Sequence, residues 1–263
     1  MSSGMKRVHF LFSLCCLLLL AASCSVSRNA SSARGRKDKV IVGISRNGTT
    51  DAKRENFAKC IRDAGGEVYF FPTYPENDSV ANAYLDRVDC LIIPGSAAND
   101  TAGRKYYDYR IVKGAIERGM PMLGICAGHQ RINSYLGGKL SKVTAAYPES
   151  DIQHHIYVDG KNVGAQSEAH IITIDKDSKL YDIFGTEYLL VNTSHKYCTS
   201  VMSDKLKVVA VAPDGIVEAY EAPNIMGLQF HPEYMYGNMG IPMFLKVFQY
   251  LVGEGRNYRD TKR

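Results

Sequence analysis

The sequence has no tryptophan, no CxxC pair and no hydrophobic run long enough to span a bilayer comfortably. The five cysteines from Cys24 onward are widely spaced, which excludes a zinc finger and a dense disulfide framework. The net charge of +5 is too small to predict nucleic-acid binding. What the chain does have is 263 residues, 45% of them hydrophobic, which is enough for one large domain with a sizeable core.

The N-terminus has the pattern of an export signal. Two basic residues, Lys6 and Arg7, precede the apolar run Phe10–Leu20, and small residues then lead to Cys24. This ending resembles a bacterial lipobox, in which Cys24 carries the lipid and begins the mature chain. We therefore expect residues 1–23 to be a signal peptide of an exported protein. Lipidation in the cell envelope, plain secretion and an uncleaved anchor remain open, and the membrane is contacted only through this N-terminus.

The rest of the chain divides into a tether, one domain and a tail. Residues 24–38 are rich in Ser, Ala, Arg and Asn and contain almost no bulky apolar residue, so we expect a flexible tether. A single globular domain is expected over residues 39–253. A short basic tail is expected over residues 254–263.

Short apolar runs alternate with helical spacing in the first half of the domain. This alternation predicts an α/β fold with a flavodoxin-like, mostly parallel central sheet and helices on both faces. Ligands in such sheets bind at the carboxyl ends of the strands. The expected strands are Lys39–Ile44, Glu67–Phe71, Cys90–Ile93 and Pro121–Ile125. The expected helices are Asp51–Ala64, Val80–Leu85, Tyr107–Arg118 and Ala127–Leu136.

The second half is richer in strands joined by short turns. This pattern predicts a smaller antiparallel region, followed by a last helix over Ile241–Leu251. The expected strands are His170–Asp175, Tyr188–Asn192, Lys207–Val211, Ile216–Tyr220 and Ile225–Phe230.

Cys126 lies between two glycines, Gly124 and Gly128, where an expected strand meets an expected helix. Gly-x-Cys-x-Gly at such a junction has the form of a nucleophile elbow, in which a tight turn presents the side chain and the glycines avoid clashes. The helix N-terminus favours a thiolate, and the Ala127 N–H points to where an oxyanion would form. The competing interpretation is a buried cysteine beside a turn.

A histidine and a glutamate follow a later strand in the stretch LQFHPE. A thiolate nucleophile needs a base, and the base needs a group that orients it. His231 leaves the strand end, and Glu233 can turn back to its imidazole. Taken alone, this stretch could be an exposed loop. Together with the elbow at Cys126, it predicts a nucleophile with its base.

These two motifs, in this order, resemble the class I glutamine amidotransferase superfamily and, within it, the γ-glutamyl hydrolase-like peptidases of the peptidase C26 type. The resemblance extends from Lys39 to about Val252. It also includes the stretches Ile92–Gly95, His170–Ile172, Ser178–Leu180, Val191–His195 and Asp214–Glu218.

The resemblance implies roles for particular residues. Cys126 corresponds to the nucleophile, His231 to the general base and acid, and Glu233 to the carboxylate that orients the histidine. The oxyanion hole corresponds to the N–H of Ala127 and an N–H of the turn at Gly95 and Ser96.

The same resemblance implies the substrate pocket. Gln130, Asn192 and His195 correspond to positions that line the γ-glutamyl pocket. Two departures from the family pattern stand out: Ser96 replaces a second glycine, and Lys196 follows His195 where relatives often have another histidine. We expect the leaving-group side of the pocket to recognise a different amine.

The implied activity is hydrolysis of a γ-glutamyl amide bond in a small compound or peptide, through a γ-glutamyl thioester and without metal or organic cofactor. Two alternatives stay open: a glutaminase subunit that passes ammonia to a synthase, and a catalytically silent γ-glutamyl-binding protein of the envelope. No metal site is expected. His154 and His155 are expected in a solvated loop or at the edge of a lid, His170 at a strand start, and His129 beneath the elbow.

Overall fold

The structure of the protein is a computed structural model that describes residues 39–46, 51–95, 102–159 and 161–262. The expected signal peptide, the lipidation site Cys24 and the expected tether lie outside the described residues, and so does Ser96. From Val40 onward the chain forms one compact unit.

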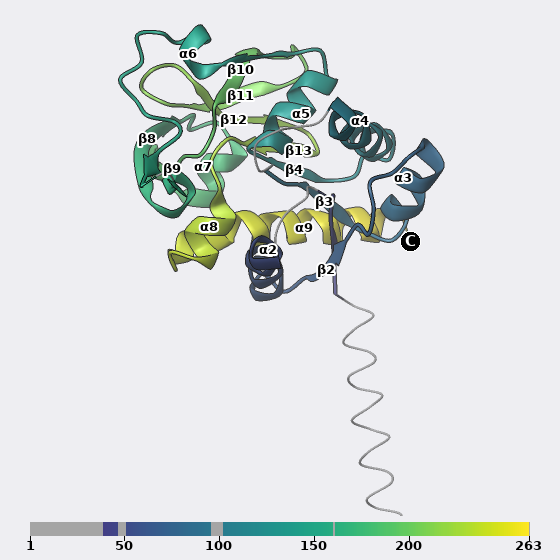
Figure 1. The fold of residues 1–263 in the computed structure, drawn as a ribbon. Coiled ribbons are helices and arrows are strands. Elements are labelled where there is room, and N and C mark those ends of the chain that lie inside the picture. Colours follow the sequence, from purple (N-terminus) through teal and green to yellow (C-terminus); the bar gives the residue numbers. More distant parts are fainter. Residues whose placement is uncertain (1–38, 47–50, 96–101, 160, 263) are drawn as a thin grey trace, which may run out of the picture. The chain divides into compact units, whose positions relative to one another are not determined.

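A nine-stranded sheet forms the centre of the domain (Figure 1). Its strand order is β2-β1-β3-β4-β13-β12-β11-β8-β9, and the first five strands are parallel. The parallel strands are β1 (Ile41–Ile44), β2 (Glu67–Phe70), β3 (Cys90–Ile93), β4 (Met122–Ile125) and β13 (Ile225–Leu228). The antiparallel strands are β8 (Glu168–Ile174), β9 (Tyr188–Asn192), β11 (Lys207–Val211) and β12 (Val217–Ala222).

The parallel strands are buried on both faces because their side chains alternate between two cores. In β3, Leu91 and Ile93 enter one core, whereas Cys90 and Ile92 enter the other. The first core is covered by α3 (Asp78–Leu85), α4 (Ala102–Glu117) and α5 (Ala127–Tyr135). The second core is covered by α2 (Asp51–Asp63), α7 (Lys179–Phe184), α8 (Pro232–Gly237) and α9 (Leu245–Thr261). The predicted parallel sheet with helices on both faces is therefore confirmed.

Smaller elements decorate the antiparallel half. Strand β5 (Lys139–Lys142) pairs with β10 (Tyr197–Val201), and β6 (Tyr157–Val158) pairs with β7 (Lys161–Asn162). The remaining short helices are α6 (Val143–Ala146), η1 (Gly164–Gln166) and η2 (Pro242–Phe244).

The antiparallel strands predicted in the second half are present, and they extend the same sheet because β12 pairs with β13. One expectation for the second half needs correction. The segment expected to be a basic tail, residues 254–263, is helical as far as Thr261, because α9 extends to that residue. Gly255 lets α9 pack closely on β3, because a Cβ at this position would lie 2.8 Å from the Cys90 sulfur.

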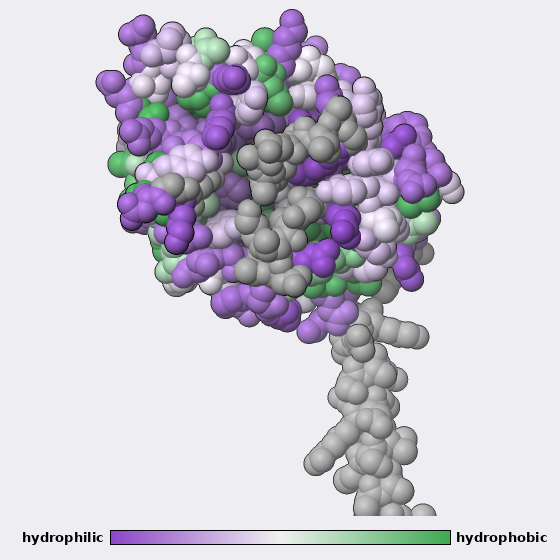
Figure 2. Space-filling view, in the orientation of Figure 1, coloured by the Kyte–Doolittle hydropathy of each residue, from purple (hydrophilic) through white to green (hydrophobic). Residues whose placement is uncertain are grey.

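The surface of the described residues is mostly polar on the face shown in Figure 2, where hydrophobic residues form only small separate groups. Within the described part of the chain, no helix combines the length and the apolar character that crossing a membrane requires.

Candidate active site

Cys126 occupies a strained turn between β4 and α5. Its φ of 51° and ψ of −104° place it in a region that non-glycine residues rarely adopt, and among the described non-glycine residues only Asp159 also has a positive φ. Such a conformation costs about 1–3 kcal/mol and persists only where the surroundings hold it. Here the Cys126 N–H donates to the Leu228 carbonyl at 2.8 Å, and the Cys126 carbonyl accepts from the Gln130 N–H at 3.1 Å. The predicted elbow geometry is present.

The glycines on both sides of Cys126 allow this turn because strand and helix approach closely. A Cβ at Gly128 would lie 1.8 Å from the carbonyl oxygen of Ile93 on the neighbouring strand. A Cβ at Gly124 would lie 2.8 Å from the Gly128 carbonyl carbon. Both contacts involve backbone atoms, which cannot rotate away. The turn therefore requires glycine at each position.

His231 and Glu233 lie beside the elbow because β13 and β4 run parallel with Leu228 next to Ile125. His231 caps the N-terminus of α8, and its Nδ1 lies 2.8 Å from Glu233 Oε1. Both side chains are buried. A Cβ at Gly95 would lie 2.7 Å from His231 Cε1 and 3.4 Å from Cys126 Cβ, so Gly95 packs against both residues.

The charges around His231 favour its protonated form. Burial alone would lower the pKa of this imidazole, but Glu233 and Cys126 outweigh burial and raise the pKa to about 10. An imidazolium here can pair with a thiolate on Cys126 and can give up its proton to a leaving group. His231 therefore pairs with Glu233 and lies against Gly95 together with Cys126, and the action of the three as a catalytic triad stays a prediction.

Asn192 holds the backbone of His231. Its side chain is fully buried, where its Oδ1 accepts from the His231 N–H at 2.8 Å. Its Nδ2 donates to the His231 carbonyl at 3.0 Å and to the Ala165 carbonyl at 2.7 Å. The amide predicted to line the substrate pocket is therefore engaged with the base-bearing segment, a positioning contact that the sequence did not reveal.

The other predicted pocket residues lie close to the elbow. Gln130 is buried one helical turn after Cys126, and its Nε2 donates to the Tyr197 carbonyl at 2.7 Å and to Gln229 Oε1 at 3.0 Å. Ala127 opens α5 and is half-buried. The Ser194 carbonyl lies 4.0 Å from the Cys126 sulfur, so the segment that contains His195 frames the nucleophile.

A buried ion pair between Arg104 and Asp108 lies next to Pro94, which follows β3. Arg104 Nη2 donates to the Pro94 carbonyl at 3.1 Å, and Arg104 Nε lies 3.2 Å from Asp108 Oδ2. Burial raises the pKa of Asp108 to about 6, although Arg104 opposes this shift. The sequence prediction missed this pair because it started the helix at Tyr107, whereas α4 begins at Ala102.

Two predictions about the remaining histidines have different outcomes. His129 is fully buried behind the elbow and stacks on the Tyr220 ring with centroids 4.5 Å apart, as predicted. The solvated loop predicted for His154 is wrong, because only 3% of this residue is exposed. Its carbonyl accepts from the His195 N–H at 2.7 Å and from Thr193 Oγ1 at 3.0 Å, which draws the loop into the protein.

The strand order and the strained cysteine at the carboxyl edge of the sheet define an α/β protein with nucleophile-elbow geometry. The chain belongs to the peptidase C26 family, whose sequence model matches residues 41–233.

Several known proteins are similar to this chain in sequence or in fold. Protein NtpR of Enterococcus hirae is 26% identical over 198 residues, covering 68% of this chain and 80% of that protein. The gamma-glutamyl-gamma-aminobutyrate hydrolase PuuD of Escherichia coli (strain K12) is 26% identical over 203 residues, covering 70% of this chain and 80% of that protein. The crystal structure of a glutamine amidotransferase from Thermotoga maritima shares the fold, with a TM-score of 0.54 and 16% identity over 84% of this chain and 97% of that chain.

Proposed function

We propose that the protein hydrolyses a γ-glutamyl amide bond in a small compound or peptide, with Cys126 as the nucleophile. The observation that carries this proposal is the strained Cys126 beside the buried His231–Glu233 pair, whose nitrogen and oxygen are 2.8 Å apart. Membership of the peptidase C26 family and similarity to a gamma-glutamyl-gamma-aminobutyrate hydrolase support the choice of a γ-glutamyl substrate.

The chemistry follows from the three side chains. The Cys126 thiolate attacks the γ-carbonyl carbon, and the oxyanion is held by the Ala127 N–H and an N–H of the turn at Gly95. His231 gives its proton to the nitrogen of the departing amine as the C–N bond breaks, which leaves a γ-glutamyl thioester. Water then attacks the thioester while His231 takes its proton. The thiol leaves and free glutamate is released.

The proposal is tested by measuring turnover of a γ-glutamyl panel with the purified protein and no partner. The panel contains a γ-glutamyl anilide, glutathione, γ-glutamyl-aminobutyrate, folate polyglutamates, glutamine and cell-wall peptides. We expect release of the amine from at least one small γ-glutamyl compound at a rate that does not depend on another protein. Glutamine turnover that appears only after a synthase is added would instead favour the ammonia-delivering subunit. Tight binding without turnover would favour the silent binder.

Replacing Glu233 with glutamine is expected to slow turnover by about 10²- to 10⁴-fold. The carboxylate raises the pKa of His231, so its removal lowers that pKa. The leaving group needs protonated His231, and the alkaline limb of the pH–rate profile should therefore move to lower pH. Turnover measured from pH 6 to 11, a range that brackets the value of about 10, checks this shift.

Glutamine keeps the size of the side chain and its hydrogen bonding, so the variant should fold as the wild type does. Glu117→Gln is the matched control, because Glu117 is exposed at the end of α4. It should leave both the rate and the pH profile unchanged. An unaltered alkaline limb in Glu233→Gln would contradict the assigned role of Glu233.

A further inference from the structure

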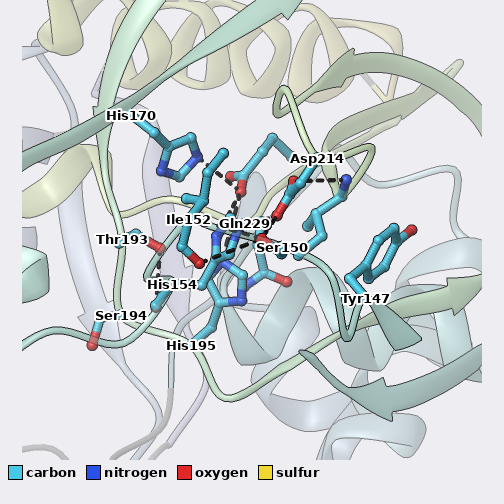
Figure 3. A network of polar contacts seen from close by, with 12 residues as sticks. Tyr147, Ser150, Ile152, His154, His170, Thr193, Ser194, His195, Asp214 and Gln229 are labelled. Atoms are coloured by element: carbon cyan, nitrogen blue, oxygen red, sulfur yellow. Dashed lines mark hydrogen bonds and ion pairs between the residues drawn. The ribbon is translucent and has the colours of Figure 1, made fainter. Parts of the chain in front are cut away.

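Three imidazole rings gather around one buried carboxylate behind the candidate active site, and Figure 3 shows the rings of His154, His170 and His195 facing one another. Glu218 Oε1 lies 3.2 Å from His170 Nε2, 3.6 Å from His195 Nε2 and 3.7 Å from His154 Nδ1. None of the four residues is more than 7% exposed. They come from different segments: β8, β12 and the loops that precede β6 and β10.

Hydrogen bonds on the outside of the cluster fix the protons of two rings. His154 Nε2 lies 2.9 Å from Asp214 Oδ2, and His195 Nδ1 lies 3.0 Å from the Tyr197 carbonyl. A backbone carbonyl can only accept a hydrogen bond, and so can an ionised carboxylate. Ser150 Oγ donates to the same carboxylate oxygen, Asp214 Oδ2, at 2.5 Å. Each outer nitrogen therefore carries the ring proton.

The inner nitrogens of these two rings, in their neutral form, point lone pairs at a carboxylate. Among the described residues, neither His154 Nδ1 nor His195 Nε2 has a hydrogen-bond partner, and neither does Glu218 Oε2. Buried lone pairs that face a carboxylate need a proton or a metal cation between them.

We propose that His154, His170, His195 and Glu218 bind one divalent transition-metal ion, with Zn²⁺ the best fit. In a tetrahedral zinc site the ligands lie about 2.0–2.1 Å from the metal, which sets them about 3.3 Å from one another. The ligand atoms of His154, His170 and Glu218 all lie within 4.8 Å of one another, and His195 Nε2, 3.6 Å from Glu218 Oε1, completes the set when its ring turns toward the ion. Three imidazoles and one carboxylate are ligands that zinc accepts.

The second layer of contacts fits a metal site as well. Metal-binding histidines commonly donate their outer N–H to a carboxylate or a backbone carbonyl, which fixes the ring. His154 does so to Asp214, and His195 does so to Tyr197. Four protein ligands leave no open position, which indicates a structural site rather than a catalytic one.

The position of the cluster gives the ion a role in shaping the pocket. His195 directly follows Ser194, whose carbonyl lies 4.0 Å from the Cys126 sulfur. Asn192, three residues before His195, holds the backbone of His231. An ion bound by His154, His195 and the two sheet residues would therefore fix the segment that frames both the nucleophile and the base.

The experiment uses the purified full-length protein carrying Cys126→Ala, so that the thiolate and His231 cannot hold metal together. The protein is stripped with chelator, loaded with Zn²⁺, passed through gel filtration and analysed for bound zinc. Co²⁺ is added to a second sample, because tetrahedral cobalt has an intense visible spectrum. We expect about one zinc per chain, since four ligands close one site. The cobalt spectrum should be tetrahedral and free of thiolate charge transfer.

Three variants locate the ion. Glu218→Gln removes a ligand and should lose the zinc, whereas Asp214→Asn keeps all four ligands and should weaken zinc affinity by about 10- to 100-fold. His155→Asn is the matched control, because His155 is adjacent in sequence but its Nε2 contacts only the Tyr157 hydroxyl at 2.8 Å. It should bind zinc as the parent does. If Glu218→Gln does not fold, the zinc affinities of Asp214→Asn and His155→Asn still show whether the ion binds at this cluster.

Two results would overturn the proposal. Absence of retained zinc together with an octahedral cobalt spectrum would mean that the cluster holds protons and not a metal. Zinc that binds equally to the parent, Glu218→Gln and Asp214→Asn would place the ion elsewhere in the protein.

Discussion

Replacing Cys126 with alanine is expected to abolish hydrolysis of a γ-glutamyl anilide, with a loss of about 10⁴- to 10⁶-fold in turnover. Without the sulfur there is no nucleophile to form the thioester. His231 can still activate water, but no covalent intermediate divides the reaction into two easier steps. The rate is measured by release of the aniline, and any residual rate reports binding and oxyanion contacts alone.

The same substitution should leave the fold intact. The Cys126 side chain interacts with His231 and is a weak donor to the Ser194 carbonyl, at 4.0 Å, and alanine needs less room. The thermal unfolding midpoint should therefore stay close to that of the wild type. Retained hydrolysis in a folded Cys126→Ala protein would contradict the nucleophile assignment.

Chemical labelling separates an active thiol from a silent one. Burial raises the pKa of Cys60 and of Cys90 well above the ordinary value, so neither should react readily with iodoacetamide. Cys126 should be labelled much faster than both. Equal labelling of Cys126 and Cys60 would favour the silent γ-glutamyl-binding protein over the hydrolase.

The elbow could be predicted because its causes are local. An apolar strand, two flanking glycines and a following helix lie within a few residues of Cys126, and each imposes its constraint on the neighbouring backbone. The pairing of His231 with Glu233 is equally local, since the two residues are two positions apart. Only their approach to Cys126 depends on the parallel register of β13 and β4.

The roles of Asn192 and His154 could not be predicted because their partners are distant in sequence. Asn192 binds the backbone of a residue 39 positions away, and His154 faces Asp214 across 60 positions. No periodicity in the chain encodes such contacts. They appear only when the antiparallel strands extend the sheet and bring β8, β9 and β12 behind the elbow. A histidine in an irregular loop therefore suggested solvent, although the fold buries it.

Replacing Gly128 with alanine is expected to destabilise the protein by about 3–5 kcal/mol, one of the larger effects that a single added methyl group can have. The new Cβ would lie 1.8 Å from the Ile93 carbonyl oxygen and 2.6 Å from its carbonyl carbon. Relief requires α5 to move away from β3, and this movement would also shift Cys126. Turnover of the folded fraction should therefore fall together with the free energy of unfolding.

Gly253→Ala is the matched control for this substitution. Gly253 lies inside α9, and a Cβ there would meet no atom within 4 Å. Alanine is favoured over glycine in a helix by about 1 kcal/mol, so this variant should be slightly more stable than the wild type, with unchanged turnover. Urea unfolding of the three proteins measures the difference. The free energy of unfolding of Gly128→Ala could instead lie within about 1 kcal/mol of the wild-type value. In that case β3 and α5 are not close enough for an added methyl group to overpack them. The strain at Cys126 would then need a cause other than the packing of α5 on β3.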